Sequence, residues 1–100
     1  MPAVIRIGDT STGHGCFAPT VLQSTPVQKT YFNGKLAGVI NSSCQYVAHT
    51  CGLVTHSGTE RAPSSGARKT YIEGNLAARI GDDIVCGDAC GQGSPNSFIE

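Results

Sequence analysis

The chain contains no tryptophan, and aromatic residues make up only 6% of its 100 residues. Large side chains that fill a hydrophobic core are therefore scarce in a chain whose length predicts one small domain. Long amphipathic helices and long apolar runs are also missing, and a run such as residues 36–40 is too short to cross a bilayer. A fold with so little core usually needs another source of stability, such as a bound metal ion.

An excess of charge of either sign is also lacking. Seven Lys and Arg residues balance seven Asp and Glu residues, for a formal net charge of +0. Nucleic acids and anionic membranes reward a basic surface, so neither is expected as the main partner, and stable membrane insertion is not expected. Residues 1–6 lack the basic and apolar regions of a secretory signal peptide.

What the chain does contain is glycine, at 13 residues, and an internal repeat. Residues 29–40 and 69–80 read KTYFNGKLAGVI and KTYIEGNLAARI, and seven of these twelve positions are identical. Each copy predicts a β-hairpin, because strand-forming residues flank a turn pair, Asn33-Gly34 or Glu73-Gly74.

Two further sequence similarities extend the repeat. Arg6-Ile7-Gly8-Asp9 recurs as Arg79-Ile80-Gly81-Asp82. Each arginine could be a binding residue, but an arginine at such a place more often pairs with a nearby acid, here Asp9 or Asp82. Residues 93–100 align with residues 66–73, while the middle copy lacks the Arg-Ile-Gly-Asp run. About three copies of a short β unit are present, and a unit this small cannot bury its own core. We therefore predict an all-β fold in which short hairpins are arranged around a central axis.

Each copy places a metal-ligating side chain after its turn, at His14, His49 and Cys86, and His56 follows one short loop after His49. Equivalent positions would converge on a shared axis. Imidazole nitrogen and thiolate sulfur are the ligands that zinc prefers, and four of them make a closed structural site. Calcium and magnesium prefer oxygen ligands. The sequence therefore predicts one structural zinc ion.

Other interpretations of these residues stay open. A single histidine is more often an ordinary surface or hydrogen-bonded residue, and the spacing is not that of a zinc finger. Cys90 competes with Cys86 as the thiolate ligand, although Cys86 is favoured by the alignment of the copies. The remaining three cysteines are expected to be small buried apolar residues: Cys16, Cys44 and Cys51. An odd cysteine count disfavours a full disulfide framework, so we expect no disulfide that folding requires.

Catalysis has little support in the sequence. A small zinc-dependent hydrolase or a Cys–His enzyme is the alternative function, but no nucleophile elbow, phosphate loop or zinc-protease motif is present. A catalytic zinc keeps one position open to water, whereas four candidate ligands would fill all positions. A redox or disulfide protein is a third hypothesis, which a free-thiol count would test. We predict a structural protein without enzymatic activity.

Four motifs together resemble the PAAR-repeat family. Residues 76–82 read LAARIGD, close to the Pro-Ala-Ala-Arg signature of the family but with leucine in place of proline. Residues 2–9, followed by Gly13-His14-Gly15, resemble the start of such a domain. Residues 49–52 and 56–58 resemble its middle, and residues 93–100 its closing strand. The resemblance covers nearly the whole chain.

The resemblance implies a cone with pseudo-threefold symmetry and a zinc ion near its apex. By motif position the ligands would be His14, His49, His56 and Cys86. The base of such a cone caps a trimeric β-helix spike, VgrG-like in a type VI secretion system or the central spike protein of a contractile phage tail. One tip per trimer sharpens the membrane-piercing spike, with effector cargo as a further partner.

The same resemblance carries expectations about domains and location. Residues 1–100 would form a single PAAR-repeat domain with no effector extension. The protein would reside in the bacterial cytoplasm before firing and then be delivered through the injection machine, or lie at the tail tip of a virion.

Overall fold

Short antiparallel strand pairs make up the regular structure of the chain. The computed structural model describes residues 2–99, so Met1 and Glu100, the ends of the predicted domain, lie outside the described residues. The elements are β1 (Leu22–Ser24), β2 (Tyr31–Phe32), β3 (Lys35–Leu36), β4 (Gln45–Tyr46), β5 (His49–Cys51), β6 (Val54–His56), the 3-10 helix η1 (Gly58–Arg61), β7 (Tyr71–Ile72) and β8 (Asn75–Leu76). The pairs are β1–β4, β2–β3, β5–β6 and β7–β8. The prediction of an all-β fold built from short hairpins is confirmed.

The two predicted hairpins form at the expected turns. In the β2–β3 hairpin Tyr31 lies opposite Leu36, and in the β7–β8 hairpin Tyr71 lies opposite Leu76. Both turn residues adopt positive φ in each case, 57° and 79° at Asn33-Gly34 and 50° and 87° at Glu73-Gly74. Two-residue turns with both φ values positive match the twist of the flanking strands, which is why these sequences turn here.

The three repeat copies are joined by a closed cycle of backbone hydrogen bonds. The cycle links residues 3–7, 36–40 and 76–80, which are the equivalent segments of the three copies. Each segment donates to the next: Ile5 N–H to Ala78 O (3.1 Å), Ala78 N–H to Gly38 O (3.1 Å) and Gly38 N–H to Ile5 O (2.9 Å). Every copy both donates and accepts a hydrogen bond in this cycle. Separating any copy from the others would therefore leave buried backbone groups of its neighbours without hydrogen-bond partners.

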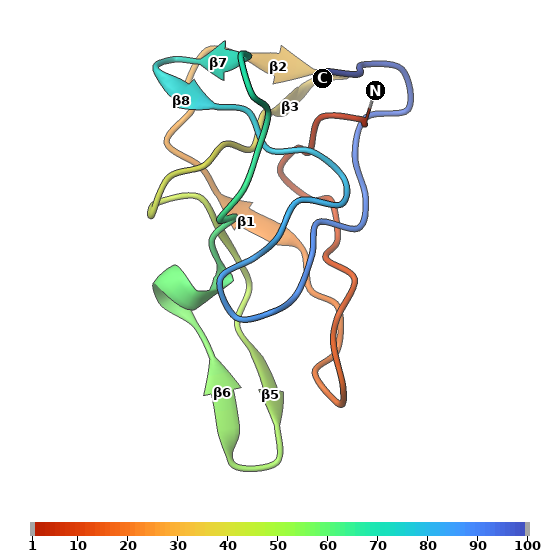
Figure 1. The fold of residues 1–100 in the computed structure, drawn as a ribbon, viewed down its shortest axis with the longest axis vertical. Coiled ribbons are helices and arrows are strands. Elements are labelled where there is room, and N and C mark those ends of the chain that lie inside the picture. The colour runs from red at the N-terminus through yellow and green to blue at the C-terminus, as the bar shows by residue number, and fades with distance from the viewer. Residues whose placement is uncertain (1, 100) are drawn as a thin grey trace.

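The chain ends complete a third hairpin-like pairing. Ser97 O accepts a hydrogen bond from Val4 N–H, just as Thr30 O does from Ala37 and Thr70 O from Ala77. Figure 1 shows both termini beside β2, β3, β7 and β8 at one end of the molecule, with the β5–β6 hairpin at the other end. The predicted alignment of residues 93–99 with 66–72 therefore corresponds to the same pairing in space.

The core lies where the three copies meet. Its buried members are mostly small or β-branched, as the shortage of aromatic residues requires; they include Val4, Ile5, Leu22, Val27, Ala37, Val39, Ala77, Ala78 and Ile84. Gly38 allows the closest approach, since a Cβ atom there would lie 2.5 Å from Ile5 Cγ1. Close backbone contact replaces the bulk that larger side chains would supply. Within residues 2–99 no helix is long and apolar enough to cross a membrane.

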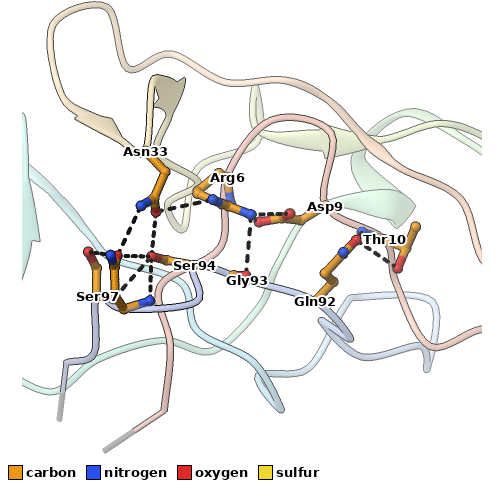
Figure 2. A network of polar contacts seen from close by, with 9 residues as sticks. Arg6, Asp9, Thr10, Asn33, Gln92, Gly93, Ser94 and Ser97 are labelled. Carbon is orange, nitrogen blue, oxygen red and sulfur yellow. Dashed lines mark hydrogen bonds and ion pairs between the residues drawn. The ribbon is translucent and has the colours of Figure 1, made fainter.

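The two Arg-Ile-Gly-Asp runs form the ion pairs expected from the sequence. Arg6 Nε and Nη2 donate to the two carboxylate oxygens of Asp9, each at 2.9 Å, and Arg79 contacts Asp82 in the same way at 3.1 and 3.0 Å. Figure 2 shows that Arg6 also donates to Asn33 Oδ1, at 3.1 Å, and to a backbone carbonyl of the closing segment. These bidentate pairs fix the turns that follow the first and third copies.

Candidate metal centre

Four side chains from three separate parts of the chain come together near the β5–β6 end. His49 and His56 lie directly opposite each other on β5 and β6, His14 comes from the loop before β1, and Cys86 comes from a turn after β8. One ligand atom from each of these four residues lies within 4.8 Å of the others. The structure therefore brings together all four residues that the sequence nominated.

The β5–β6 hairpin sets the spacing of its two histidines. Gly52, with φ of 63°, forms the turn, and Cys51 pairs with Val54 and Thr50 with Thr55. Directly opposite residues of an antiparallel pair project from the same face. The register therefore places both imidazoles on one side of the hairpin.

His14 is positioned by a tight turn. Its N–H donates to Phe17 O (3.1 Å), and Phe17 N–H donates back to His14 O (2.8 Å). Gly13 precedes the turn with φ of 75°, and a Cβ atom there would lie 2.8 Å from Phe17 O. A larger residue at position 13 would displace the turn that holds the imidazole.

Cys86 is held by the 3-10 helix that follows β6. Its backbone N–H donates to Glu60 O (2.9 Å), and the preceding Val85 N–H donates to Ala62 O (3.0 Å). Gly87, at φ of 100°, allows the chain to turn back so that its N–H reaches Ile84 O. The helix therefore connects the thiol of Cys86 to the segment that carries His56.

The protonation of His49 suits metal ligation. Its Nδ1 atom lies 3.0 Å from Ala18 O, so this nitrogen is the proton donor and Nε2 presents its lone pair to the cluster. Burial lowers the pKa of His49, and the nearby positive charge of Arg61 lowers it further, although the hydrogen bond to Ala18 opposes this. The neutral imidazole, which is the ligating form, is therefore favoured.

Two distances in the cluster are close to those around a tetrahedral ion of the size of zinc. His49 Nε2 lies 3.2 Å from His56 Nδ1, and Cys86 Sγ lies 3.8 Å from His49 Nε2. Zinc–nitrogen bonds of 2.0–2.1 Å in a tetrahedron separate two nitrogen ligands by about 3.3 Å. His14 Nδ1 is buried and has no hydrogen-bond partner among residues 2–99. A metal ion would satisfy this nitrogen, so the residues present could hold one.

Phe17 forms an apolar wall beside the cluster. Its ring centroid lies 4.2 Å from that of His56, 4.7 Å from that of His49 and 4.8 Å from that of His14. An aromatic ring against all three imidazoles keeps water away from one side of the site. Bonds to an ion strengthen in such a low-dielectric environment.

Two of the cysteine expectations need correction. Cys16 is exposed and Cys51 is partly exposed, so neither is a buried apolar residue; the two form a disulfide with a Cα–Cα distance of 5.5 Å. They flank the candidate metal cluster rather than the core, each two residues after a candidate ligand, His14 or His49. That folding requires no disulfide stays a prediction.

The other two non-cluster cysteines lie in the core. Cys44 is buried, as expected, and Cys90 is 1% exposed. Burial raises the pKa of Cys90 to about 12, the value of a thiol that stays protonated. Because Cys90 packs in the core, Cys86 is the thiol placed to bind an ion.

Three residues near the site were not identified from the sequence. They are Phe17, Arg61 and Asp88. Arg61 and Asp88 form an ion pair in which both side chains are completely buried. Arg61 stands in a Gly-, Ser- and Thr-rich stretch that reads as a surface loop. Nothing in that local pattern indicates burial, because the groups that surround Arg61 come from distant segments.

Comparison of the sequence with protein-family models gave no match, and no curated protein sequence matched it.

Proposed function

We propose that the protein is a PAAR-type spike tip: a non-enzymatic cone that binds one zinc ion near its apex and caps a trimeric β-helix spike. The single observation that carries this proposal is the meeting of His14, His49, His56 and Cys86, with ligand atoms within 4.8 Å of one another. His49 and His56 lie at the base of the β5–β6 hairpin, whose turn lies at the end of the molecule remote from the termini (Figure 1). Zinc would supply folding energy there and link the loop of His14 to β5, β6 and the Cys86 turn.

Three exposed aromatic rings, here called the pad, support docking at the end of the molecule that holds the termini. Tyr31, Tyr71 and Phe98 occupy equivalent positions of the three hairpin-like units and are 58%, 64% and 52% exposed. The strands β2 and β7, which carry the two tyrosines, lie together at the end that holds the termini (Figure 1). Exposed rings repeated in this way are typical of an interaction surface.

The threefold character of the partner follows from the repeat. A trimeric β-helix presents the same surface three times around its axis. A single chain can meet all three protomers alike only if it offers equivalent groups three times. The cyclic hydrogen bonds among residues 5, 38 and 78 and the three exposed rings favour such a pseudo-threefold arrangement.

The pointed shape that the function needs is proposed for the β5–β6 end. This hairpin extends away from the other elements in Figure 1, along the longest dimension of a molecule of 37 × 24 × 22 Å. Few apolar contacts are available in a narrow hairpin, so a central ion and the Cys16–Cys51 disulfide would give it the rigidity that piercing requires. We infer that this end leads when the spike moves.

The zinc-hydrolase alternative is less well supported. Catalytic zinc sites use three protein ligands and leave the fourth position to water. Here a fourth candidate ligand, Cys86, accompanies the three histidines, and the Phe17 ring lies against their imidazoles. Structural zinc is therefore the better proposal.

Mixing the zinc-loaded protein with a candidate trimeric β-helix spike tests the docking. Light scattering after gel filtration is expected to give one copy of this chain per three spike chains. The triple variant Y31S/Y71S/F98S is expected to reduce the affinity at least 10-fold, because aromatic residues dominate binding energy at interfaces.

Leu53→Ser is the matched control, since Leu53 is fully exposed in the turn of the β5–β6 hairpin, far from the pad. It should leave docking unchanged. Failure to bind the trimeric spike, or equal loss of affinity with the control and the triple variant, would contradict the proposed docking surface.

A further inference from the structure

Arg61 is completely buried beside the metal cluster, and all of its donors are used. Nε donates to Val47 O (3.1 Å), and Nη2 donates to Ser11 Oγ (3.1 Å) and to Thr20 Oγ1 (2.6 Å). Nη1 contacts Asp88 Oδ2 (2.9 Å) and Cys86 Sγ (3.4 Å). These five contacts equal the five N–H groups of a guanidinium. The position of each N–H is therefore fixed by partners from distant segments.

The contact with the sulfur is the one that reaches a candidate ligand. The planar guanidinium is oriented by its other four hydrogen bonds, so the remaining Nη1–H is aimed at Cys86 Sγ without freedom to rotate away. A hydrogen bond to a metal-bound thiolate fixes the direction of the sulfur lone pairs. The backbone of the same segment also holds Cys86, through its N–H bond to Glu60 O.

The positive charge of an arginine would repel a nearby metal ion unless a negative group compensated that charge. Asp88 supplies the compensation, because its carboxylate pairs with Arg61 at 2.9 Å and both side chains are 0% exposed. Thr12 Oγ1 and Ala89 N–H hold the other carboxylate oxygen at 2.7 and 2.8 Å. The Arg61–Asp88 pair is neutral as a unit, so the N–H···S bond remains without a net repulsion between guanidinium and ion.

We propose that Arg61 is a positioning residue of the metal centre, whose Nη1–H group holds the Cys86 sulfur toward the ion and thereby increases metal affinity and retention. This rests on the metal-binding part of the proposed function and is independent of docking on a spike. Groups that orient a ligand in this way typically change metal affinity 10- to 100-fold when they are lost.

The test uses Arg61→Lys, which keeps the positive charge near Asp88 but cannot direct five donors. Zinc competition titrations are expected to show affinity about 10- to 100-fold weaker than wild type. In the cobalt(II)-loaded protein, the sulfur-to-cobalt charge-transfer band should move to longer wavelength, because a thiolate that loses a hydrogen bond donates electrons more readily. A purely structural role would not move this band.

Arg6→Lys is the matched control, since it alters another buried arginine, one that pairs with Asp9 away from the cluster. It should change neither zinc affinity nor the cobalt spectrum. R61M/D88N is the second variant, because it removes both buried charges together and leaves neither unpaired; it should behave as R61K does.

A measurement on the unaltered protein complements the variants. With cadmium-113 in the site, nuclear spin coupling between the metal and an Arg61 guanidinium proton is expected through the N–H···S bond. Absence of this coupling, or wild-type affinity and spectrum in either Arg61 variant, overturns the inference. If wild-type protein binds neither zinc nor cobalt, the metal centre itself is refuted, and the role of Arg61 with it.

Discussion

Individual cysteines have different chemistry in this molecule because the backbone places them in different environments. Cys86 lies with three histidines, whereas Cys90, four residues further on, is buried among apolar side chains. Cys86→Ala is expected to weaken zinc binding at least 100-fold, since removing a ligand costs more than removing a group that only orients one. Cys90→Ala should retain one zinc per chain at near wild-type affinity, as measured by competition with a chelating dye. Equal losses in the two variants would contradict the assignment.

Two of the four candidate ligands, His14 and Cys86, could be predicted from the sequence because the repeat provided a register. His14 and Cys86 follow equivalent Gly-Asp turns, and the structure places both turns alike, each with a bidentate Arg–Asp pair. Arg61 could not be found in this way, because its burial depends on Ser11, Thr20 and Asp88, which the sequence keeps far apart. The pairing of Cys16 with Cys51 was missed for the same reason.

At the level of elements, the β7–β8 hairpin is attached to the preceding repeat copy through its turn. The carboxylate of Glu73 accepts hydrogen bonds from the N–H groups of Lys29 (2.9 Å) and Gln28 (3.1 Å) and from the Thr30 hydroxyl (3.0 Å). These hydrogen bonds, that of Lys29 foremost, lower the pKa of Glu73. Ionised Glu73 therefore stabilises the fold above the ordinary glutamate pKa of about 4.3, and this contribution is lost as pH falls through the lowered pKa.

Glu73→Gln is expected to be less stable than wild type at pH 6, with the difference shrinking toward pH 3. Urea unfolding of both proteins measures this difference in stability. A chelator is present, so that loss of a bound metal at low pH does not contribute to the comparison. A difference that stays constant across this pH range would show that the carboxylate charge does not make the link.

The disulfide joins two other elements, the turn that carries His14 and strand β5. Cys16 and Cys51 are 35 residues apart in sequence. Closing a loop of this size restricts the unfolded chain, so C16S/C51S should lower the free energy of unfolding by about 2–4 kcal/mol. The proposed zinc ion would join the same elements, so the double variant is expected to fold when zinc is supplied. Chemical denaturation with and without zinc measures both effects, and an unfolded zinc-loaded variant would contradict the expectation that folding requires no disulfide.

How far the sequence predicts elements depends on the local signal. The turns at Asn33-Gly34 and Glu73-Gly74 are encoded by residues that tolerate positive φ, and both hairpins form where expected. The β5–β6 hairpin was not predicted as such, because its Cys-Gly-Leu-Val run lacks a strong hairpin-turn pair and strict alternation. Its formation brings His49 opposite His56, so a hairpin with a weak local signal is the element that completes the site.

For the whole molecule, two parts differ in what holds them together. The part near the termini has the apolar core and the cyclic hydrogen bonds among residues 5, 38 and 78. The part near β5 and β6 has exposed apolar residues, such as Leu53 and Val54, and relies on polar contacts and the candidate metal centre. Stability is therefore expected to be unevenly distributed along the molecule.

Removal of zinc tests this division. At free zinc about 100-fold above the dissociation constant, binding adds about 2.7 kcal/mol, which corresponds to a rise in Tm of about 10–20 °C for a domain of this size. In the metal-free protein, hydrogen exchange should accelerate at His14, His56 and Cys86, because the bonds that join their segments are gone. The amides of Ile5 and Ala78 should stay protected, since their partners lie in the cycle rather than at the metal centre. Uniform loss of protection at all of these amides would mean that the ion holds the entire fold together, and the two-part description would then be wrong.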